Sequence, residues 1–210
     1  MKIYLIRHGE TDWNKLRRLQ GQADIPLNEF GRQLARETEP ALRNVPFDRI
    51  YTSPLKRARE TAELVTAGRN LPIIEEPRLK EMGFGEFEGL CCREEGWNIP
   101  DPGFRDFFNA PEKYRPPKGG ESFQQVSDRL ESFLKELYAT EELQDKTVLL
   151  STHGAALCGI LRLIKKNPME RYWDGGVHKN CAVTIVEVKD GKATILQEAV
   201  TYYNEAVEDW

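Results

Sequence analysis

The stretch YLIRHGETDWN, residues 4–14, ends an apolar run with an arginine and a histidine. The run Ile3–Ile6 is continuous rather than alternating, which is typical of a strand that is covered on both faces of a sheet. Arg7 and His8 follow at its carboxyl end. Because open α/β sheets bind their ligands at the carboxyl ends of the strands, this abrupt change from apolar to basic residues predicts a site.

The composition limits the kind of protein that can carry such a site. The chain has 210 residues, of which 40% are hydrophobic and 30% are charged, with a formal net charge of -4. This length predicts a single domain over residues 1–210 with a modest insertion. The negative charge gives no general attraction to nucleic acid or to an anionic membrane, so we expect neither partner, and any bound anion must be held locally.

The sequence shows no pattern typical of a signal peptide, a membrane span or a CxxC cysteine motif. The apolar run before Arg7 is too short for a signal peptide, and no later segment approaches membrane-spanning length. The four cysteines show no CxxC spacing, and we expect Cys91, Cys92, Cys158 and Cys181 to be reduced thiols. The sequence therefore predicts a cytoplasmic protein.

Short apolar runs alternate with helical patterns along the chain. Asn28 is a predicted helix N-cap, Ser53 is a second one before Pro54, and Ser122 forms a capping box with Gln125. Strands are predicted in FDRIYTSP, LPIIEE, KTVLLST and CAVTIVEV, and the last continues through the turn KDGK into a hairpin. This order predicts an α/β fold with a mostly parallel sheet and an antiparallel edge. Residues 82–120, which lack periodicity, are expected to form an insertion over the sheet edge.

Histidine and arginine residues follow three of the predicted strands. His8 follows the first strand, Arg57 lies in the first turn of the helix after the second, and His153 follows the strand KTVLLST. Arginine offers a fork of donors for phosphate oxygens, and helix N-termini add backbone N–H groups. Because a neutral imidazole is a nucleophile, these groups together predict phosphoryl transfer through a covalent intermediate.

The motifs LIRHGET, SPLKRARETA and STHGA resemble those of the histidine phosphatase superfamily, the phosphoglycerate mutase-like family, over most of the chain. The resemblance implies a three-layer phosphoglycerate mutase-like fold, with helices on both faces of the sheet and a small cap insertion at about 82–120. It implies that His8 is phosphorylated while Arg7, Arg57 and His153 hold the phosphoryl oxygens. The segment RLKEMGFGEFEG places Glu81 at the family's acid-base position, and no metal or cofactor is expected.

The resemblance extends to weaker positions around this core. Further substrate contacts are expected from a polar and glycine set consisting of Asn14, Gln20, Gly21 and Gly154. Glu76, Glu86 and Glu88 are competing carboxylates near Glu81. The third histidine, His178, is expected near the rim of the site or exposed; a metal site built on the three histidines is disfavoured, since no HxxxH or HExxH spacing occurs.

Three functions compete for this set of residues: a phosphomonoesterase of small molecules, a cofactor-dependent phosphoglycerate mutase, and an inactive binding protein on the same fold. The inactive binding protein is disfavoured because the central residues of the family motifs are all present. Mutases of the family usually carry an arginine directly after the catalytic glutamate and a paired arginine in the insertion, whereas Met82 follows Glu81 here and no Arg-Arg pair occurs in residues 82–120. FGEFEG and GGES are more similar to the phosphatase branch, which we favour.

The insertion is rich in aromatic residues. The set comprises Phe84, Phe87, Trp97, Phe104, Phe107, Phe108 and Tyr114. These rings either anchor an irregular segment or line the pocket as an apolar lid. In the second case, Trp97 and Phe107 are expected to favour aryl or other bulky phosphomonoesters over 3-phosphoglycerate.

Overall fold

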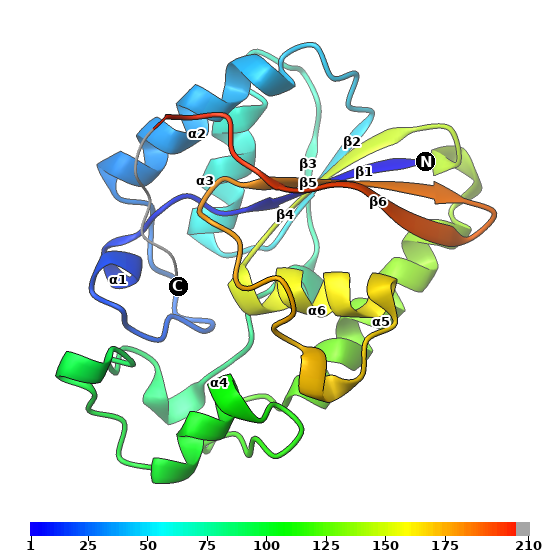
Figure 1. Ribbon diagram of the computed structural model, residues 1–210. Helices are drawn as coiled ribbons and strands as arrows, with labels where there is room; N and C mark the ends of the chain where they lie inside the picture. Colours follow the sequence, from blue (N-terminus) through cyan, green and yellow to red (C-terminus); the bar gives the residue numbers. More distant parts are fainter. Residues whose placement is uncertain (205–210) are drawn as a thin grey trace.

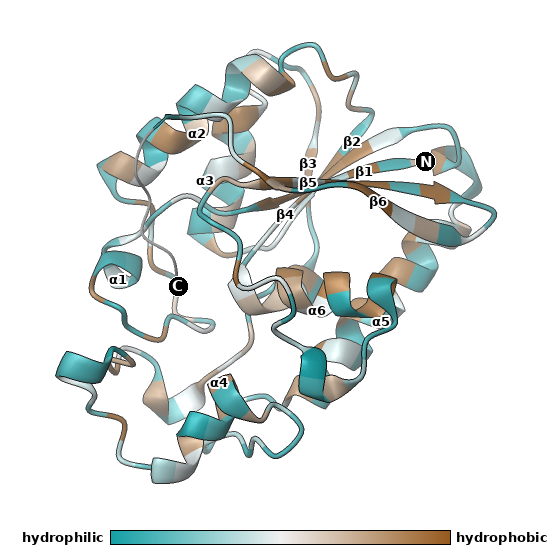
Figure 2. Cartoon of the chain, viewed as in Figure 1, coloured by the Kyte–Doolittle hydropathy of each residue, from teal (hydrophilic) through white to brown (hydrophobic). Residues whose placement is uncertain are grey.

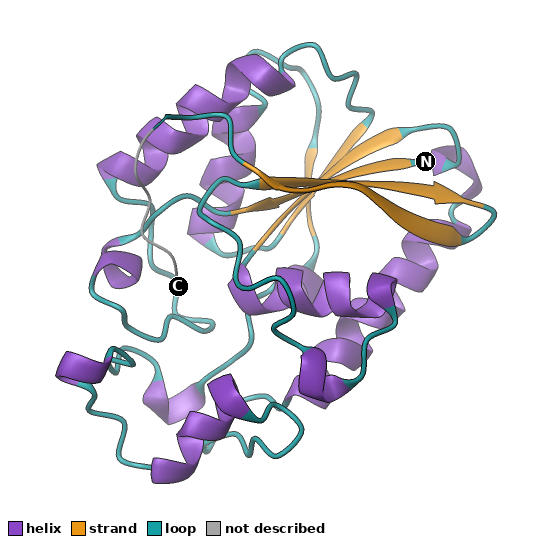
Figure 3. Cartoon of the chain, viewed as in Figure 1, coloured by secondary structure: helices purple, strands orange, loops and turns teal. Residues whose placement is uncertain are grey.

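The computed structural model describes residues 1–204 and contains a six-stranded sheet between two layers of helices (Figure 1). The strand order is β3-β2-β4-β1-β5-β6. The strands are β1 (Lys2–Arg7), β2 (Arg49–Thr52), β3 (Ile73–Glu75), β4 (Thr147–Thr152), β5 (Val183–Lys189) and β6 (Lys192–Val200). The predicted strands are therefore all present, and Figure 3 shows them as one continuous twisted layer.

The sheet is mostly parallel, as the sequence predicted. The β1–β4, β2–β4 and β2–β3 pairs are parallel, whereas β5 runs antiparallel to both β1 and β6. Arg7 pairs with Thr152, and Thr52 pairs with Ser151, so β1, β2 and β4 end at the same level. This register brings the segments after the three strands to one rim.

Helices cover both faces of the sheet. In Figure 1, α2 and α3 lie on one face, and α5 and α6 lie on the other. The helices are α1 (Asp12–Lys15), α2 (Glu29–Leu42), α3 (Lys56–Val65), α4 (Asp106–Asn109), α5 (Phe123–Ala139) and α6 (Gly154–Lys165). Figure 2 shows apolar residues concentrated in the strands, and the buried side chains form one apolar cluster on each side of the sheet. The result is a three-layer α/β fold.

Two of the three predicted helix caps are confirmed, and one is wrong. Asn28 accepts a hydrogen bond from Gly31 N, and the capping box between Ser122 and Gln125 is formed. However, α3 begins at Lys56 after Leu55, which makes no side-chain cap. The Ser53 hydroxyl instead accepts from the Leu55 N–H, two residues later, at 3.3 Å. This local turn uses the hydroxyl that a helix N-cap would need.

Residues 82–120 form an irregular cap made of short helical turns and α4. The cap, green in Figure 1, lies beside the carboxyl ends of the parallel strands, on the side of α5 and α6. An isolated bridge between Arg18 and Cys91 connects it to the segment after α1. No helix within residues 1–204 is long and apolar enough to cross a membrane. That residues 1–210 form a single domain remains a prediction.

Candidate active site

A pocket of about 240 Å³ opens between the rim of the sheet and the cap. Its polar lining contains all the predicted site residues except His153: Arg7, His8, Asn14, Gln20, Gly21, Arg57, Glu81 and Gly154. The strand register explains much of this convergence. Arg7 and His8 lie at the end of β1, α3 follows β2, and α6 follows β4, and these three strands end at the same level.

His8 is buried and held by its own backbone surroundings. Its Nδ1 lies 2.7 Å from the Gly9 carbonyl oxygen, which can only accept, so Nδ1 carries the proton and Nε2 keeps a lone pair. Asn180 donates to the His8 carbonyl oxygen at 2.9 Å. Burial, followed by the charges of Arg57 and Arg7, holds the pKa of His8 well below its ordinary value. At neutral pH the imidazole is therefore uncharged and able to act as a nucleophile.

Arg7 and Arg57 place two buried guanidinium groups at the pocket. Arg57 donates from Nη1 to the Ala23 carbonyl and from Nη2 to the Gly21 carbonyl, both at 2.7 Å. Arg7 donates to the His178 carbonyl. Burial lowers the pKa of each arginine to about 10, which still leaves both cationic at neutral pH. Backbone carbonyls thus orient positive charge toward the space in front of His8.

His153 lies next to His8, with ring centroids 5.1 Å apart, but it is fully buried and does not line the pocket. Its Nε2 is 2.8 Å from the Ser53 hydroxyl. Because that hydroxyl already accepts from Leu55 N, its single proton is available for Nε2, and we assign the remaining proton of the ring to Nδ1. Among residues 1–204, Nδ1 has no hydrogen-bond partner. Burial and neighbouring charges, Arg57 first, hold the pKa of His153 well below its ordinary value.

Glu81 reaches the pocket at the N-terminus of α6. Its Oε1 accepts from Ala156 N at 2.9 Å and from Met82 N at 3.0 Å, and its Oε2 accepts from Ala155 N at 3.1 Å. Backbone N–H groups at a helix N-terminus are a favourable partner for a carboxylate. These bonds fix the carboxyl head beside Gly154, at the edge of the pocket.

The competing carboxylates lie elsewhere. Glu86 is exposed, Glu76 pairs with Arg78 at 2.7 Å, and Glu88 accepts from two backbone N–H groups of the neighbouring loops. None of these three lines the pocket. Glu81 is therefore the carboxylate that the fold brings to the pocket.

Asn14, Gln20 and Gly21 also line the pocket. The Thr11 N–H donates to the Asn14 oxygen at 3.0 Å. The Thr11 hydroxyl, which has one proton to donate, lies 3.1 Å from the same oxygen and 3.0 Å from the Gln20 oxygen, so it links the two amides. Gly21 has a φ of 50°, and an added Cβ would lie 2.1 Å from a Glu88 oxygen. A side chain at this position would therefore have to displace the Glu88 carboxylate.

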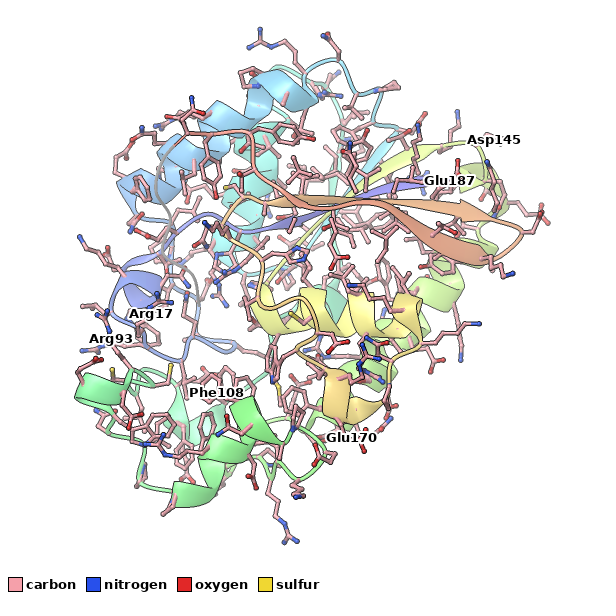
Figure 4. All side chains as sticks on the ribbon, viewed as in Figure 1. Arg17, Arg93, Phe108, Asp145, Glu170 and Glu187 are labelled. Atoms are coloured by element: carbon pink, nitrogen blue, oxygen red, sulfur yellow. The ribbon has the colours of Figure 1, made fainter. Side chains whose placement is uncertain are left out.

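The apolar part of the lining comes largely from the cap. Phe84, Phe107 and Phe108 line the pocket, as does Trp173 from the segment after α6. Trp97 does not line the pocket: it packs on Phe104 and beneath the Arg105 guanidinium at 4.4 Å, so of the two roles considered for the aromatic residues it has the anchoring one. The sequence left the choice open because the density of aromatic residues does not say which rings of a cap face the pocket. Figure 4 labels Phe108, which projects from α4.

Trp173 is a lining residue that sequence reasoning missed. Its indole Nε1 donates to the Phe107 carbonyl at 2.7 Å, so the segment after α6 is joined to the cap. The nearest signal in the sequence is the aromatic pair Tyr172 and Trp173, which stands alone between a helix and a hairpin.

His178 is buried rather than exposed, and its own side chain does not line the pocket. It does lie near the rim, as the other alternative predicted, since Arg7 and the preceding Val177 both line the pocket. The reason is that its backbone carbonyl holds Arg7 while its ring packs near Thr184 and Glu198. Within the described part of the chain, no group of three or more His, Cys, Asp or Glu residues is arranged to hold a metal ion.

A family model for the histidine phosphatase superfamily (branch 1) matches residues 3–201. The chain belongs to this superfamily. It is 36% identical over 159 residues to the uncharacterized phosphatase PhoE of Bacillus subtilis, covering 76% of this chain and 75% of that protein. It is 33% identical over 196 residues to a probable phosphoglycerate mutase GpmB of an Enterobacter species, covering 90% of this chain and 86% of that protein.

Among solved structures, Bacillus stearothermophilus YhfR is similar, with a TM-score of 0.88 and 37% identity. The similarity covers 96% of this chain and 98% of YhfR. The sequence prediction of a histidine phosphatase superfamily fold is thereby confirmed. The superfamily's relatives include proteins named phosphatase and proteins named mutase, so the choice between them depends on the pocket of this chain.

Proposed function

We propose that this protein is a phosphomonoesterase that hydrolyses small-molecule phosphate esters through a phosphohistidine intermediate. The observation that carries the proposal is the state of His8, an uncharged imidazole with its lone pair on Nε2, placed beside two cationic arginines in a pocket that also contains Glu81. Nucleophile, anion-binding groups and a proton carrier are thus within one pocket.

The reaction proceeds as a double displacement. His8 Nε2 forms a bond to phosphorus while the bond to the ester oxygen breaks, and Glu81, acting as an acid, gives the leaving alkoxide its proton. Glu81 as a carboxylate then takes a proton from water, whose oxygen attacks the phosphohistidine and releases phosphate and neutral His8. Arg7 and Arg57, which line the pocket, stabilise the negative charge on the phosphoryl oxygens. His153 does not line the pocket, but its ring lies next to His8 and its Nδ1 has no partner within residues 1–204, so we propose that this N–H donates to the same oxygens when the ester is bound. No metal or cofactor takes part.

The lining supports a phosphatase with a preference for apolar leaving groups. Beyond the cationic floor, the walls are formed by the rings of Phe84, Phe107, Phe108 and Trp173. No lysine or arginine of residues 82–120 lines the pocket, and Met82 follows Glu81. A small carboxylated ester such as 3-phosphoglycerate therefore gains less binding energy here than an ester with a planar or bulky apolar group.

The mutase alternative is supported by the similarity to proteins named probable phosphoglycerate mutase, at 33% to 36% identity. A phosphate-release screen across alkyl, aryl, nucleoside and sugar phosphomonoesters, run beside a mutase assay on 3-phosphoglycerate, separates the two. We expect phosphate release from bulky esters, no mutase turnover, and loss of all turnover in His8→Ala. Mutase turnover that exceeds phosphate release would overturn the proposal.

A further inference from the structure

The loop that carries Glu81 is held by one guanidinium group from α5, the helix that lies beside α6. Arg129, on α5, donates from Nη1 to the carbonyl oxygens of Arg78 at 2.6 Å and of Lys80 at 2.8 Å. It donates from Nη2 to the carbonyl oxygen of Glu81 itself at 3.1 Å. The side chain of Arg129 is only 17% exposed. One residue therefore binds three carbonyls of a four-residue stretch that ends at the proposed acid.

Glu121 takes the remaining donors of Arg129. The Nε group donates to Glu121 Oε1 at 2.9 Å, and Nη2 donates to Oε2 at 3.1 Å, a bidentate pair. All five N–H donors of the guanidinium are then used. A lysine at this position cannot reproduce the arrangement, because an ammonium group has three donors and no planar fork.

Glu121 extends the same clamp to the residues after Glu81. Its Oε2 accepts from the Gly83 N–H at 2.9 Å and from Gln22 Nε2 at 3.1 Å. Gln22 Nε2 also lies within 3.3 Å of the Glu81 carbonyl. The backbone is thus fixed on both sides of Glu81, while the N-terminus of α6 fixes its carboxyl head.

We propose that Arg129, paired with Glu121, is a positioning residue for the acid-base chemistry of Glu81. Neither residue lines the pocket, so their effect passes through the backbone of residues 78–83. A proton carrier must lie within hydrogen-bond reach of the ester oxygen, and a displacement of about 1 Å can cost about a hundredfold in rate. The proposal rests on the role proposed for Glu81, whose failure the following experiment detects separately.

The test compares two classes of ester in four variants. Aryl esters with good leaving groups, such as p-nitrophenyl phosphate, depend little on an acid, whereas alkyl phosphates depend on it strongly. We expect Arg129→Met to lower kcat/KM for the alkyl ester at least about tenfold more than for the aryl ester, in the direction of Glu81→Gln. Glu121→Gln removes the ion pair with little change of volume, and it should shift the ratio in the same direction even if Arg129→Met fails to fold.

Arg162→Met is the matched control. Arg162, on α6, donates to the Ser127 hydroxyl of α5 at 3.0 Å and to the Asn167 carbonyl just after α6 at 2.9 Å. Within residues 1–204, neither of these bonds reaches residues 78–83. Arg162→Met should lower Tm and leave the alkyl-to-aryl ratio unchanged. Equal losses for both esters in Glu121→Gln and in any folded Arg129→Met, or a comparable shift in Arg162→Met, would overturn the positioning role. An unchanged ratio in Glu81→Gln would overturn the role of Glu81 and this proposal with it.

Discussion

The buried, uncharged state of His8 predicts a specific dependence of stability on pH. The folded-state pKa of His8 is held well below its ordinary value by burial and by two arginines, whereas the unfolded chain takes up a proton near a pKa of about 6.5. As pH falls below this value, the unfolded state binds one more proton than the folded state at this position. The sign is therefore a loss of stability on acidification, and the loss stops once the pH drops below the folded pKa.

The magnitude follows from the linkage slope. One extra proton in the unfolded state lowers the free energy of unfolding by about 1.4 kcal/mol for each pH unit once the unfolded histidine is fully protonated. Urea unfolding of the wild type and of His8→Gln, measured at several pH values between neutral and mildly acidic, isolates this contribution because the carboxylates are common to both. We expect the wild-type free energy to fall more steeply than that of the variant. Parallel curves would refute the argument that His8 stays uncharged in the folded protein.

Three further predictions concern the surroundings of His8. Ser53→Ala removes the donor to His153 Nε2, and we expect kcat/KM to fall about tenfold; nitrogen NMR of the histidine-labelled protein shows whether the proton leaves Nδ1, and an unchanged tautomer would contradict the assignment. Phe108→Ala, at a side chain 39% exposed, should change stability by less than about 1 kcal/mol and lower kcat/KM more for aryl than for small alkyl esters; equal losses would speak against a ring contact with substrate. Exhaustive chelation should leave turnover unchanged, and a loss restored by a divalent ion would contradict the metal-free mechanism.

The parts of the fold that the sequence predicted well depend on local signals. The apolar run before Arg7 predicts a buried strand. Asn28 and Ser122 are residues that favour helix N-caps, and both do cap helices. The turn at Asp190 and Gly191 predicts the hairpin that the structure shows. Because carboxyl ends of parallel strands meet at one rim, these local assignments also predicted that His8 and Arg57 would meet.

The parts that the sequence could not predict depend on pairing between distant segments. Ser53 resembles a helix cap locally, and only the packing of β2 against β4 shows that its hydroxyl meets His153, 100 residues away. In the sequence, Arg129 is one of several charged residues on an amphipathic helix. Only the structure shows that the loop before Glu81 packs against this helix and that Arg129 binds its carbonyl groups. The sequence likewise does not show that Phe107 lines the pocket and Trp97 does not. That depends on the contact between the irregular cap and Trp173, whose indole donates to the Phe107 carbonyl.

The most direct test of the central claim is to trap the phosphoryl group on its nucleophile. The protein is mixed with a turned-over phosphomonoester, quenched in alkali, in which N-phosphohistidine survives, and digested for mass spectrometry. The account predicts phosphate on the peptide that contains His8, its loss on treatment with acid, and no label in His8→Ala. Label of equal intensity in His8→Ala, or phosphate on another residue of the wild type, would contradict it.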